Sequence, residues 1–199
     1  MSDLTDSMTP TLIASEWTVE PVPMHEGKRL VQELHYSKSH PNTATYLHGL
    51  RRAEPFSQID GIAWWIPPTR SAAEAIAGDN WRGVLALSRL VVHPSVPKNG
   101  ASFLLGNSMR MIDRDRWPVL VTYADTRLGH TGAIYRATNW ICDGPVPAGD
   151  VWLGPNGEQR GRKRGRKTLT RSEMEALGFR RAPAAPKIRF RHVVGGEQP

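Results

Sequence analysis

The stretch 84–125 constrains the fold most, because it places two apolar strand-like runs on either side of one helix-like segment. VLALSRLVVH (84–93) is rich in Val and Leu and is followed by Pro94, and VLVTYAD (119–125) is a second apolar run. Between them, apolar residues recur at helical spacing over about 101–115: Ala101, Leu104, Leu105, Met109 and Ile112. Two strands joined through a helix are expected to be parallel, with a right-handed crossover.

The rest of the chain mixes helix-like and strand-like segments. Further helices are expected at 27–36, 71–78, 131–140 and in TRSEMEALG (170–178), and strands at 59–66, within 141–159 and at 187–194. Thr170 and Glu173 have the spacing of a capping box, and Leu169 and Met174 that of a hydrophobic staple. Residues 37–52 are polar and loop-like. This order predicts an α/β (α+β) fold, a mixed sheet flanked by helices.

The predicted domain organisation is an N-terminal extension (1–24) and one domain (25–199). That domain includes a basic arm (159–171) and a C-terminal strand (187–194). The N-terminus lacks the basic and apolar regions of a secretory signal, and no apolar stretch approaches the length of a membrane span. The single cysteine, Cys142, excludes a disulfide framework. We therefore expect a cytoplasmic protein that has no membrane partner.

Positive charge is concentrated near the C-terminus. Residues 159–192 contain twelve Lys or Arg residues and two acidic residues, Glu173 and Glu175. The whole chain carries a net charge of +7. Glycines interrupt the densest part, GRKRGRKTLTR, so the backbone can follow a line of phosphates. Such an asymmetric run favours nucleic-acid contact through counterion release. The alternative is a solvated tail that aids solubility. The residues predicted to contact DNA here are Arg162, Lys163, Arg164, Arg166 and Lys167.

The start of the helix at 101–115 is a candidate anion site. Lys98, Asn99 and Gly100 precede it and Ser102 lies in its first turn. Backbone N–H groups at a helix start bind anions such as pyrophosphate. The Walker spacing is absent, and the alternative is a plain strand–helix turn in which Ser102 acts as a cap.

Three further positions could carry chemistry. Asp125 ends a buried strand, where α/β sheets place ligands, although it could equally cap the following helix. Tyr135 could donate a proton to a leaving thiolate, or be a half-buried aromatic core residue. His130 could act in acid–base chemistry, or be structural.

The segment VQELHYSKSHPN (31–42) crowds polar groups at a helix end. His35, Tyr36, Ser37 and Lys38 could line a substrate mouth, with Tyr36 stacking on a base. His35 and His40 could share a metal, but five-residue spacing without a carboxylate does not support one, and no metal site is predicted.

Three segments share a longer pattern: HYS (35–37), LSRLVVHPSVPKNGASFLLG (87–106) and YADTRLGHTGAIYRATNWICDG (123–144). Together they resemble the Mom family of bacteriophage DNA-modification proteins, a divergent branch of the GNAT acyltransferase fold. The resemblance covers about residues 25–145. The usual Gln/Arg-x-x-Gly-x-Gly/Ala pyrophosphate loop of the wider superfamily is replaced here by Pro-Lys-Asn-Gly-Ala-Ser.

The resemblance implies a centrally splayed sheet that binds acetyl-CoA or a related CoA thioester. It also implies conversion of adenine in DNA to a carbamoylmethyl form, which shields DNA from restriction. The positions that match the family's implicated residues are His35, Arg89, Ser102, Asp125 and Tyr135. We assign Arg89 and Ser102 to the cofactor, with Lys98, Asn99 and Gly100. Tyr135 is assigned as the acid, and Asp125 and His35 as groups acting on the base.

The leading hypothesis is a transferase that modifies the adenine amine in double-stranded DNA. Two alternatives are a GNAT acetyltransferase acting on a protein or small amine, and a non-catalytic DNA-binding module. Because attack on an acetyl thioester does not yield a carbamoylmethyl group, the donor stays open. In a duplex, the target base would leave the stack. Trp64 and Trp65 could stack on it, although core packing is the preferred interpretation for both.

Overall fold

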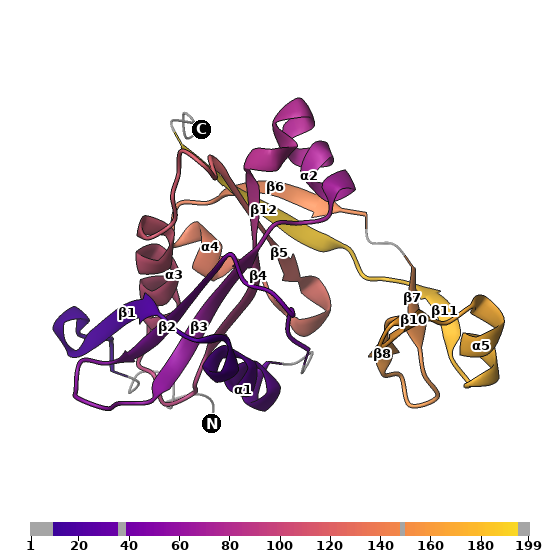
Figure 1. Ribbon diagram of the computed structural model, residues 1–199, viewed down its shortest axis with the longest axis horizontal. Helices are drawn as coiled ribbons and strands as arrows, with labels where there is room; N and C mark the ends of the chain where they lie inside the picture. The colour runs from indigo at the N-terminus through magenta and orange to yellow at the C-terminus, as the bar shows by residue number, and fades with distance from the viewer. Residues whose placement is uncertain (1–9, 36–38, 148–149, 195–199) are drawn as a thin grey trace, which may run out of the picture. The chain divides into compact units, whose positions relative to one another are not determined.

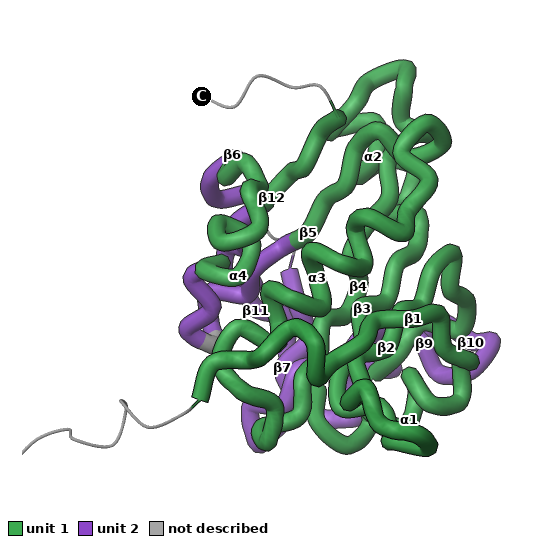
Figure 2. The backbone as a smooth tube through the Cα atoms, turned by 90° about the vertical axis from the view of Figure 1, so that its left-hand side faces the viewer, with its two compact units in different colours: residues 1–122, 132–142, 190–199 green, residues 123–131, 143–189 purple. Residues whose placement is uncertain are grey.

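The computed structural model describes residues 10–35, 39–147 and 150–194. They belong to two compact units (Figure 2). Unit 1 comprises residues 1–122, 132–142 and 190–199, and unit 2 comprises residues 123–131 and 143–189. Among the described residues, no helix has both the length and the apolar character needed to cross a bilayer.

The main sheet has seven strands in the order β1-β2-β3-β4-β5-β12-β6 (Figure 1). Its strands are β1 (Trp17–Pro21), β2 (Tyr46–Arg52), β3 (Ile59–Ile66), β4 (Val84–Val92), β5 (Val119–Asp125), β6 (Ile141–Val146) and β12 (Lys187–Val193). The helices of unit 1 are α1 (Met24–Leu34), α2 (Arg70–Ala77), α3 (Gly100–Arg110) and α4 (Ala133–Arg136), with 3-10 turns η1 (Ala14–Glu16) and η2 (Gly78–Gly83). β1 to β4 form an antiparallel meander.

The predicted parallel pair is confirmed. β4 and β5 run parallel and pair at Val84–Ala86 with Val119–Val121, and α3 connects them. The neighbouring β3–β4 ladder extends much further, from Ile66↔Ala86 to Gly61↔Val92. The β4–β5 ladder thus ends early, which agrees with a sheet that opens at its centre.

Two adjacent tryptophans of β3 show how both faces of this sheet are covered. Trp64 packs with Leu30 and Val31 of α1, whereas the indole of Trp65 bonds to Ser108 of α3. Both indoles are fully buried. Burying a large apolar side chain is worth about 1.5–3 kcal/mol. The core interpretation of Trp64 and Trp65 is therefore confirmed, and neither ring is available to stack on a base.

Unit 2 is built from short elements. β7 (Asp150–Leu153) lies between β11 (Arg180–Pro183) and β8 (Gln159–Arg160), and a separate hairpin pairs β9 (Lys163–Arg164) with β10 (Lys167–Thr168). The unit also contains α5 (Arg171–Ala176) and the 3-10 turn η3 (Thr126–Leu128). Its hydrophobic cluster is Trp152, Leu169, Met174 and Phe179. The predicted capping box of Thr170 and Glu173 is confirmed, and the two staple residues both belong to the cluster.

Several predicted elements differ from the structure. Residues 37–52, predicted as a loop, contain β2, because Leu47 and Leu50 are buried between neighbouring elements. β1 lies within residues 1–24, so the sheet begins inside the segment predicted as an extension. The helix predicted at 131–140 is the four-residue α4, followed by Asn139 in the left-handed region (φ 62°). Ile134 of α4 is 38% exposed and therefore does not face the core.

Two further differences concern loops. The helix predicted over 101–115 ends at Arg110, where Met111 and Ile112 bond back to the last carbonyls of α3. The basic stretch, expected as an extended arm, folds into β8, β9 and β10. Its glycines permit the reversal: Gly165, between β9 and β10, has a positive φ of 56°.

Candidate functional site: a cavity beside α3 and a buried aromatic cluster

The β4–α3 junction is a tightly held turn. Asn99 precedes α3 with φ 69°, and the Ser102 hydroxyl donates to the Asn99 carbonyl (3.0 Å). A Cβ on Gly100 would lie 2.3 Å from Val96 Cγ1, so only glycine fits there. The backbone of Lys98 is bonded to the N-terminal segment at Pro10 and Leu12. The Ser102 hydroxyl therefore bonds to the residue just before α3, as the alternative turn interpretation expects. Ser102 also borders a cavity.

That cavity lies entirely within unit 1 and has a volume of about 1020 Å³. Pockets of about 300–1,000 Å³ hold small ligands and cofactors. Two predicted cofactor residues, Asn99 and Ser102, line it. The further polar lining residues come from α3, from the segment after it, from the turn after α4 and from β12: Asn107, Arg110, Arg114, Thr138, Asn139 and His192.

Arg114 and His192 both line the cavity and contact each other. Arg114 Nη2 donates to the carbonyl oxygens of Pro118 (3.1 Å) and His192 (3.3 Å) and lies 3.4 Å from His192 Nδ1. Burial, together with the charge of Arg114, lowers the pKa of His192. A neutral imidazole beside a fixed guanidinium leaves Arg114 as the persistent charge here. Sequence reasoning missed both residues, since neither lies in a recognisable motif.

Arg89, assigned to the cofactor, holds a loop. Its Nε donates to the carbonyl of Ser39 (2.8 Å), and its Nη1 donates to the Ser88 carbonyl (2.6 Å). The imidazole of His40 stacks on Trp64, with ring centroids 6.2 Å apart and planes at 8°. Arg89 and Trp64 thus position residues 39–40, which follow the predicted substrate-mouth segment. Arg89 and Lys98 do not belong to the cavity lining described above.

The segment around His35 is described in part. His35 ends α1, where its N–H bonds to the Val31 carbonyl (3.0 Å), and it is half-buried. The predicted DNA contacts Tyr36, Ser37 and Lys38 lie outside the described residues. Among the residues that are described, no group of three or more His, Cys, Asp or Glu could hold a metal ion.

Tyr135 lies in an aromatic cluster of unit 1. Its ring centroid is 5.1 Å from that of Phe190 and 5.8 Å from that of Trp140. Trp140 also stacks on Trp65 at 6.4 Å. Gly132 begins α4 with φ 78°, and a Cβ there would lie 2.2 Å from the Phe190 ring. The half-buried Tyr135 is therefore held by aromatic packing.

Asp125 belongs to unit 2, where it caps a turn. Its carboxylate accepts from the backbone N–H of Arg127 (3.1 Å) and pairs with the Arg127 guanidinium (3.5 Å). Arg127 in turn donates to Gln159 (2.5 Å), and the Thr126 hydroxyl donates to the Pro186 carbonyl (2.7 Å). Asp125 thus caps η3, not the longer helix expected after it. His130, the third residue predicted here, is exposed.

A buried polar network supports α3 against the sheet. Ser108 Oγ accepts from Trp65 Nε1 (2.8 Å) and lies 2.7 Å from His48 Nδ1. Burial lowers the pKa of His48, so its imidazole is held neutral. Sequence reasoning missed this network because His48 lies in the stretch interpreted as a loop. The available signal was the pair of apolar residues Leu47 and Leu50 within the polar stretch.

The basic residues of unit 2 make local contacts. Arg162 Nε donates to the Leu169 carbonyl (2.7 Å), Arg164 donates to the Gly161 carbonyl (2.8 Å), and Lys167 pairs with Glu173. Lys163 and Arg166 are exposed. The predicted DNA-contacting cations of this segment are thus arranged by a folded hairpin.

The strand order and the early end of the β4–β5 ladder define a GNAT-type transferase fold. Three solved structures share it at sequence identities that show the fold alone. A provisionally assigned acetyltransferase of Acinetobacter baylyi ADP1 has a TM-score of 0.54 at 9% identity, covering 94% of each chain. A mosquito arylalkylamine N-acetyltransferase like 5b has a TM-score of 0.53 at 10% sequence identity, and the match covers 89% of this chain and all of that one. The yncA protein of Salmonella typhimurium, solved with its cofactor acetyl-CoA, has a TM-score of 0.52 at 10% sequence identity. That match covers 92% of this chain and 96% of the other.

Within this fold class, the chain belongs to the Mom protein family, which matches residues 16–173. The chain is also similar to the methylcarbamoylase mom of Escherichia phage Mu, with 28% identity over 135 residues. That match covers 64% of this chain and 53% of the relative, so it spans about half of the relative's length. The predicted family and fold class are both confirmed.

Proposed function

We propose that this chain is a transferase that modifies the exocyclic amine of adenine in double-stranded DNA with a carbamoylmethyl-type group. The observation that carries the proposal is membership of the Mom family over residues 16–173, with a relative named as a methylcarbamoylase. The excess of cations in residues 159–192 supports a polyanionic substrate. The enzyme would act in the bacterial cytoplasm and protect DNA from restriction.

A CoA-type donor fits the cavity of unit 1. Its volume is sufficient for a cofactor, and Asn99, Ser102 and Arg110 provide amide, hydroxyl and guanidinium groups for phosphate or amide oxygens. One neighbour of the same fold was solved with acetyl-CoA. When bound, such a donor supplies an activated carbon attached to a thiol leaving group. Lys98 and Gly100 would assist at the helix start.

The acceptor needs help from the protein. The lone pair of the adenine amine is delocalised into the ring, so a nearby base must take a proton as the new bond forms. We assign that role to Asp125 and His35, and we assign protonation of the leaving group to the hydroxyl of Tyr135. The packing of Tyr135 against Trp140 and Phe190 restricts its ring, as a positioned acid requires. Arg89 positions the loop at Ser39 and would act through it.

The product constrains the donor. Attack of the amine on the carbonyl of an acetyl thioester forms an N-acetyl group. A carbamoylmethyl product instead needs a bond from the amine nitrogen to a methylene carbon. A plain acetyl thioester therefore does not supply this product in one step, and the mass of the modified nucleoside identifies the transferred group.

The test is mass spectrometry of nucleosides from plasmid DNA of cells that express the chain. We expect an adenine adduct with the wild type and its loss with Tyr135→Phe. The matched control is Tyr46→Phe, which removes a tyrosine hydroxyl that accepts from the Asp113 N–H (3.4 Å). DNA binding by Tyr135→Phe should equal that of the wild type.

Three outcomes would contradict parts of the proposal. Unaltered nucleosides in every condition, with acetylated proteins or small amines present, would favour the acetyltransferase alternative suggested by the named neighbours. DNA binding without any adduct would favour a non-catalytic module. An unchanged adduct level with Tyr135→Phe would remove Tyr135 from the chemistry.

A further inference from the structure

Four arginines of unit 2 converge on one pocket of about 440 Å³. They are Arg160 of β8, Arg162 in the loop after it, Arg171 at the start of α5 and Arg181 of β11. Asp150 is the acidic residue of the lining, and Gln159 and Trp152 also border the pocket. The whole pocket belongs to unit 2.

Strand register brings two of these arginines together. Trp152 of β7 is paired with Arg160 on one side and with Arg181 on the other. Directly opposed residues place their side chains on the same face of a sheet. The two arginines therefore flank Trp152, which is 8% exposed and belongs to the hydrophobic cluster of the unit. Residues more than twenty positions apart in the sequence thus share one cationic face.

Three of the guanidinium groups are held in place through Nε. Arg162 Nε donates to the Leu169 carbonyl (2.7 Å), Arg171 Nε to Glu175 (2.7 Å) and Arg181 Nε to Asp150 (2.6 Å). A guanidinium has five N–H donors, so each group keeps further donors after making that bond. Because the side chains are already ordered, less conformational entropy is lost when a ligand binds.

The chemistry of the pocket selects an anion with several oxygens. The four guanidinium groups outnumber the two carboxylates that pair with them, Asp150 and Glu175. A phosphate would balance the remaining positive charge while accepting paired N–H bonds. The nearly buried indole of Trp152 offers little ring surface for stacking a base. The pocket therefore suits recognition of the nucleic-acid backbone, not of base edges.

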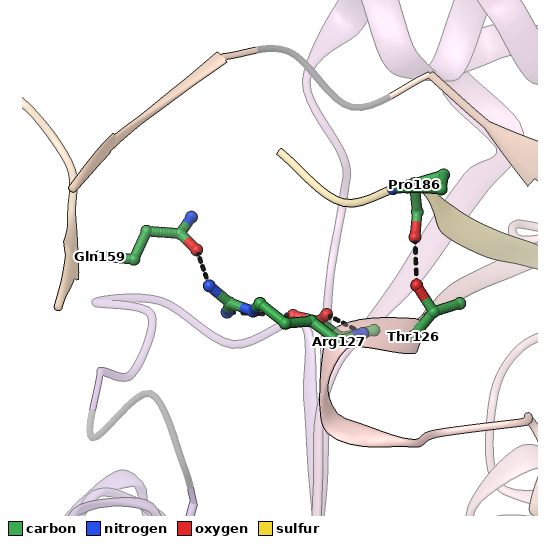
Figure 3. Close-up of polar contacts among 5 residues, drawn as sticks. Thr126, Arg127, Gln159 and Pro186 are labelled. Atoms are coloured by element: carbon green, nitrogen blue, oxygen red, sulfur yellow. Dashed lines mark hydrogen bonds and ion pairs between the residues drawn. The ribbon is translucent and has the colours of Figure 1, made fainter. Parts of the chain in front are cut away.

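A short chain of polar contacts links this pocket to Asp125. Gln159, at its border, accepts from Arg127 (Figure 3). Arg127 also pairs with the Asp125 carboxylate. The same unit thus carries four converging arginines and, through Gln159 and Arg127, the carboxylate assigned to the acceptor base.

We propose that the pocket of Arg160, Arg162, Arg171 and Arg181 binds a phosphodiester of the DNA backbone and thereby seats the duplex on unit 2. This inference rests on the proposed function, since it names how that substrate is held. It replaces an extended basic arm by a folded site, and it adds Arg160, Arg171 and Arg181 to the DNA-contacting residues.

The test compares two double variants that remove equal charge. Arg160→Gln with Arg181→Gln alters the pocket. Arg180→Gln with Lys187→Gln is the control, because Arg180 neighbours Arg181 on the opposite face of β11 and Lys187 is exposed on β12. Binding to a fluorescent 20-base-pair duplex is measured by anisotropy across a salt series; this length is an arbitrary probe, on the order of two helical turns.

The expected result is a loss of affinity of about tenfold for the pocket variant, with a salt-dependence slope reduced by about one unit, because the pocket contacts one phosphate. The control should change the slope by well under one unit. A second variant, Arg160→Lys with Arg181→Lys, keeps the charge but removes the paired N–H geometry. It should retain the slope and lose affinity by a few fold. Circular dichroism shows whether each variant is folded.

Further measurements distinguish DNA from CoA as the phosphate ligand of the pocket, and separate the pocket assignment from the proposed function. CoA affinity should be the same in pocket variant and wild type; a drop in CoA affinity with unchanged DNA affinity would overturn the assignment to DNA. Equal losses in pocket and control variants would also overturn it. If pocket-dependent DNA binding occurs without any modified nucleoside, the proposed function falls and the pocket stands. If both pocket variants modify DNA normally and keep the DNA affinity of the wild type, the pocket assignment falls and the proposed function stands.

Discussion

The two units of the molecule show two ways of building a binding surface. In unit 1, the cavity beside α3 rests on long strands with a large apolar core, and α3 itself is held to the sheet by buried contacts such as Ser108 with Trp65. In unit 2, the arginine pocket rests on strands of two to four residues and a cluster of four hydrophobic side chains. Its groups are ordered mainly by exposed ion pairs and backbone carbonyls. Unit 1 should therefore respond to changes in packing, and unit 2 to changes in charge and pH.

The largest effect is expected from Gly132→Ala in unit 1. The new Cβ would lie 2.2 Å from the Phe190 ring, at a residue with φ 78°. Overpacking and positive-φ strain each cost about 1–3 kcal/mol, so we expect a destabilisation of about 3–5 kcal/mol by chemical denaturation.

Gly129→Ala is the matched control. Gly129 has φ 72°, and its new Cβ would meet no heavy atom within 4 Å among the described residues beyond its chain neighbours. This variant should therefore lose only the conformational part, about 1–2 kcal/mol. Equal losses in the two variants would mean that the Phe190 contact does not constrain α4.

A smaller effect is expected from Ser108→Ala. The change leaves two buried groups, His48 Nδ1 and Trp65 Nε1, without this partner. Each unsatisfied buried group costs about 1–3 kcal/mol, and we expect about 2–4 kcal/mol in the free energy of unfolding, measured in urea.

Ser102→Ala is the comparison for that variant, because its hydroxyl makes one bond to the Asn99 carbonyl on the exposed side of α3. It should cost less than about 1 kcal/mol. A loss as large as that of Ser108→Ala would show that burial does not decide the cost.

The smallest effect concerns α5 in unit 2. The side chain of Lys167 and the backbone N–H of Thr170 lower the pKa of Glu173 to about 2. Because the pKa is lower in the folded state, this carboxylate stabilises the helix fully above its unfolded value near 4.5 and loses that effect as the pH falls towards 2. The amide-exchange protection factors of α5 should therefore fall within that window before those of β3 do.

Glu173→Gln should remove most of this pH dependence. Glu175→Gln on the same helix is the control, since Glu175 pairs with Arg171 but takes no part in the capping box. If the amide-exchange protection factors of α5 and β3 change equally between pH 4.5 and 2, the contrast between the units is contradicted.

Much of the fold could be predicted from local pattern. β3 and β5 have the predicted bounds, because their apolar runs are flanked by residues that end strands, such as Pro67. The capping box of α5 was predictable since its partners are three residues apart. β2 was not, because His48 and Gly49 make the segment look polar, and their burial depends on β1, β3 and α3.

The candidate site was predictable only in part. Ser102 and Asn99 do border a cavity, but Arg89 bonds to Ser39, fifty residues away in the chain. The other side of that cavity comes from residues 137–139, which lie in the 123–144 pattern but were assigned no role, and from residues 192–194, which carry no motif. A side chain's partner across the fold depends on strand order and register, which short-range spacing does not encode.

The sequence alone determined the α/β class, the parallel β4–β5 pair, the location of positive charge and the family resemblance. The first three follow from residue type and from periodicity over a few turns of chain, and the resemblance follows from the order of residues in three segments. Only the tertiary structure decided that Arg160 and Arg181 flank one tryptophan, that His48 is buried against Ser108, and that Gly132 must be glycine beneath Phe190. Each of these depends on atoms brought together from distant segments, where packing distances of a few ångströms decide which side chain can be present.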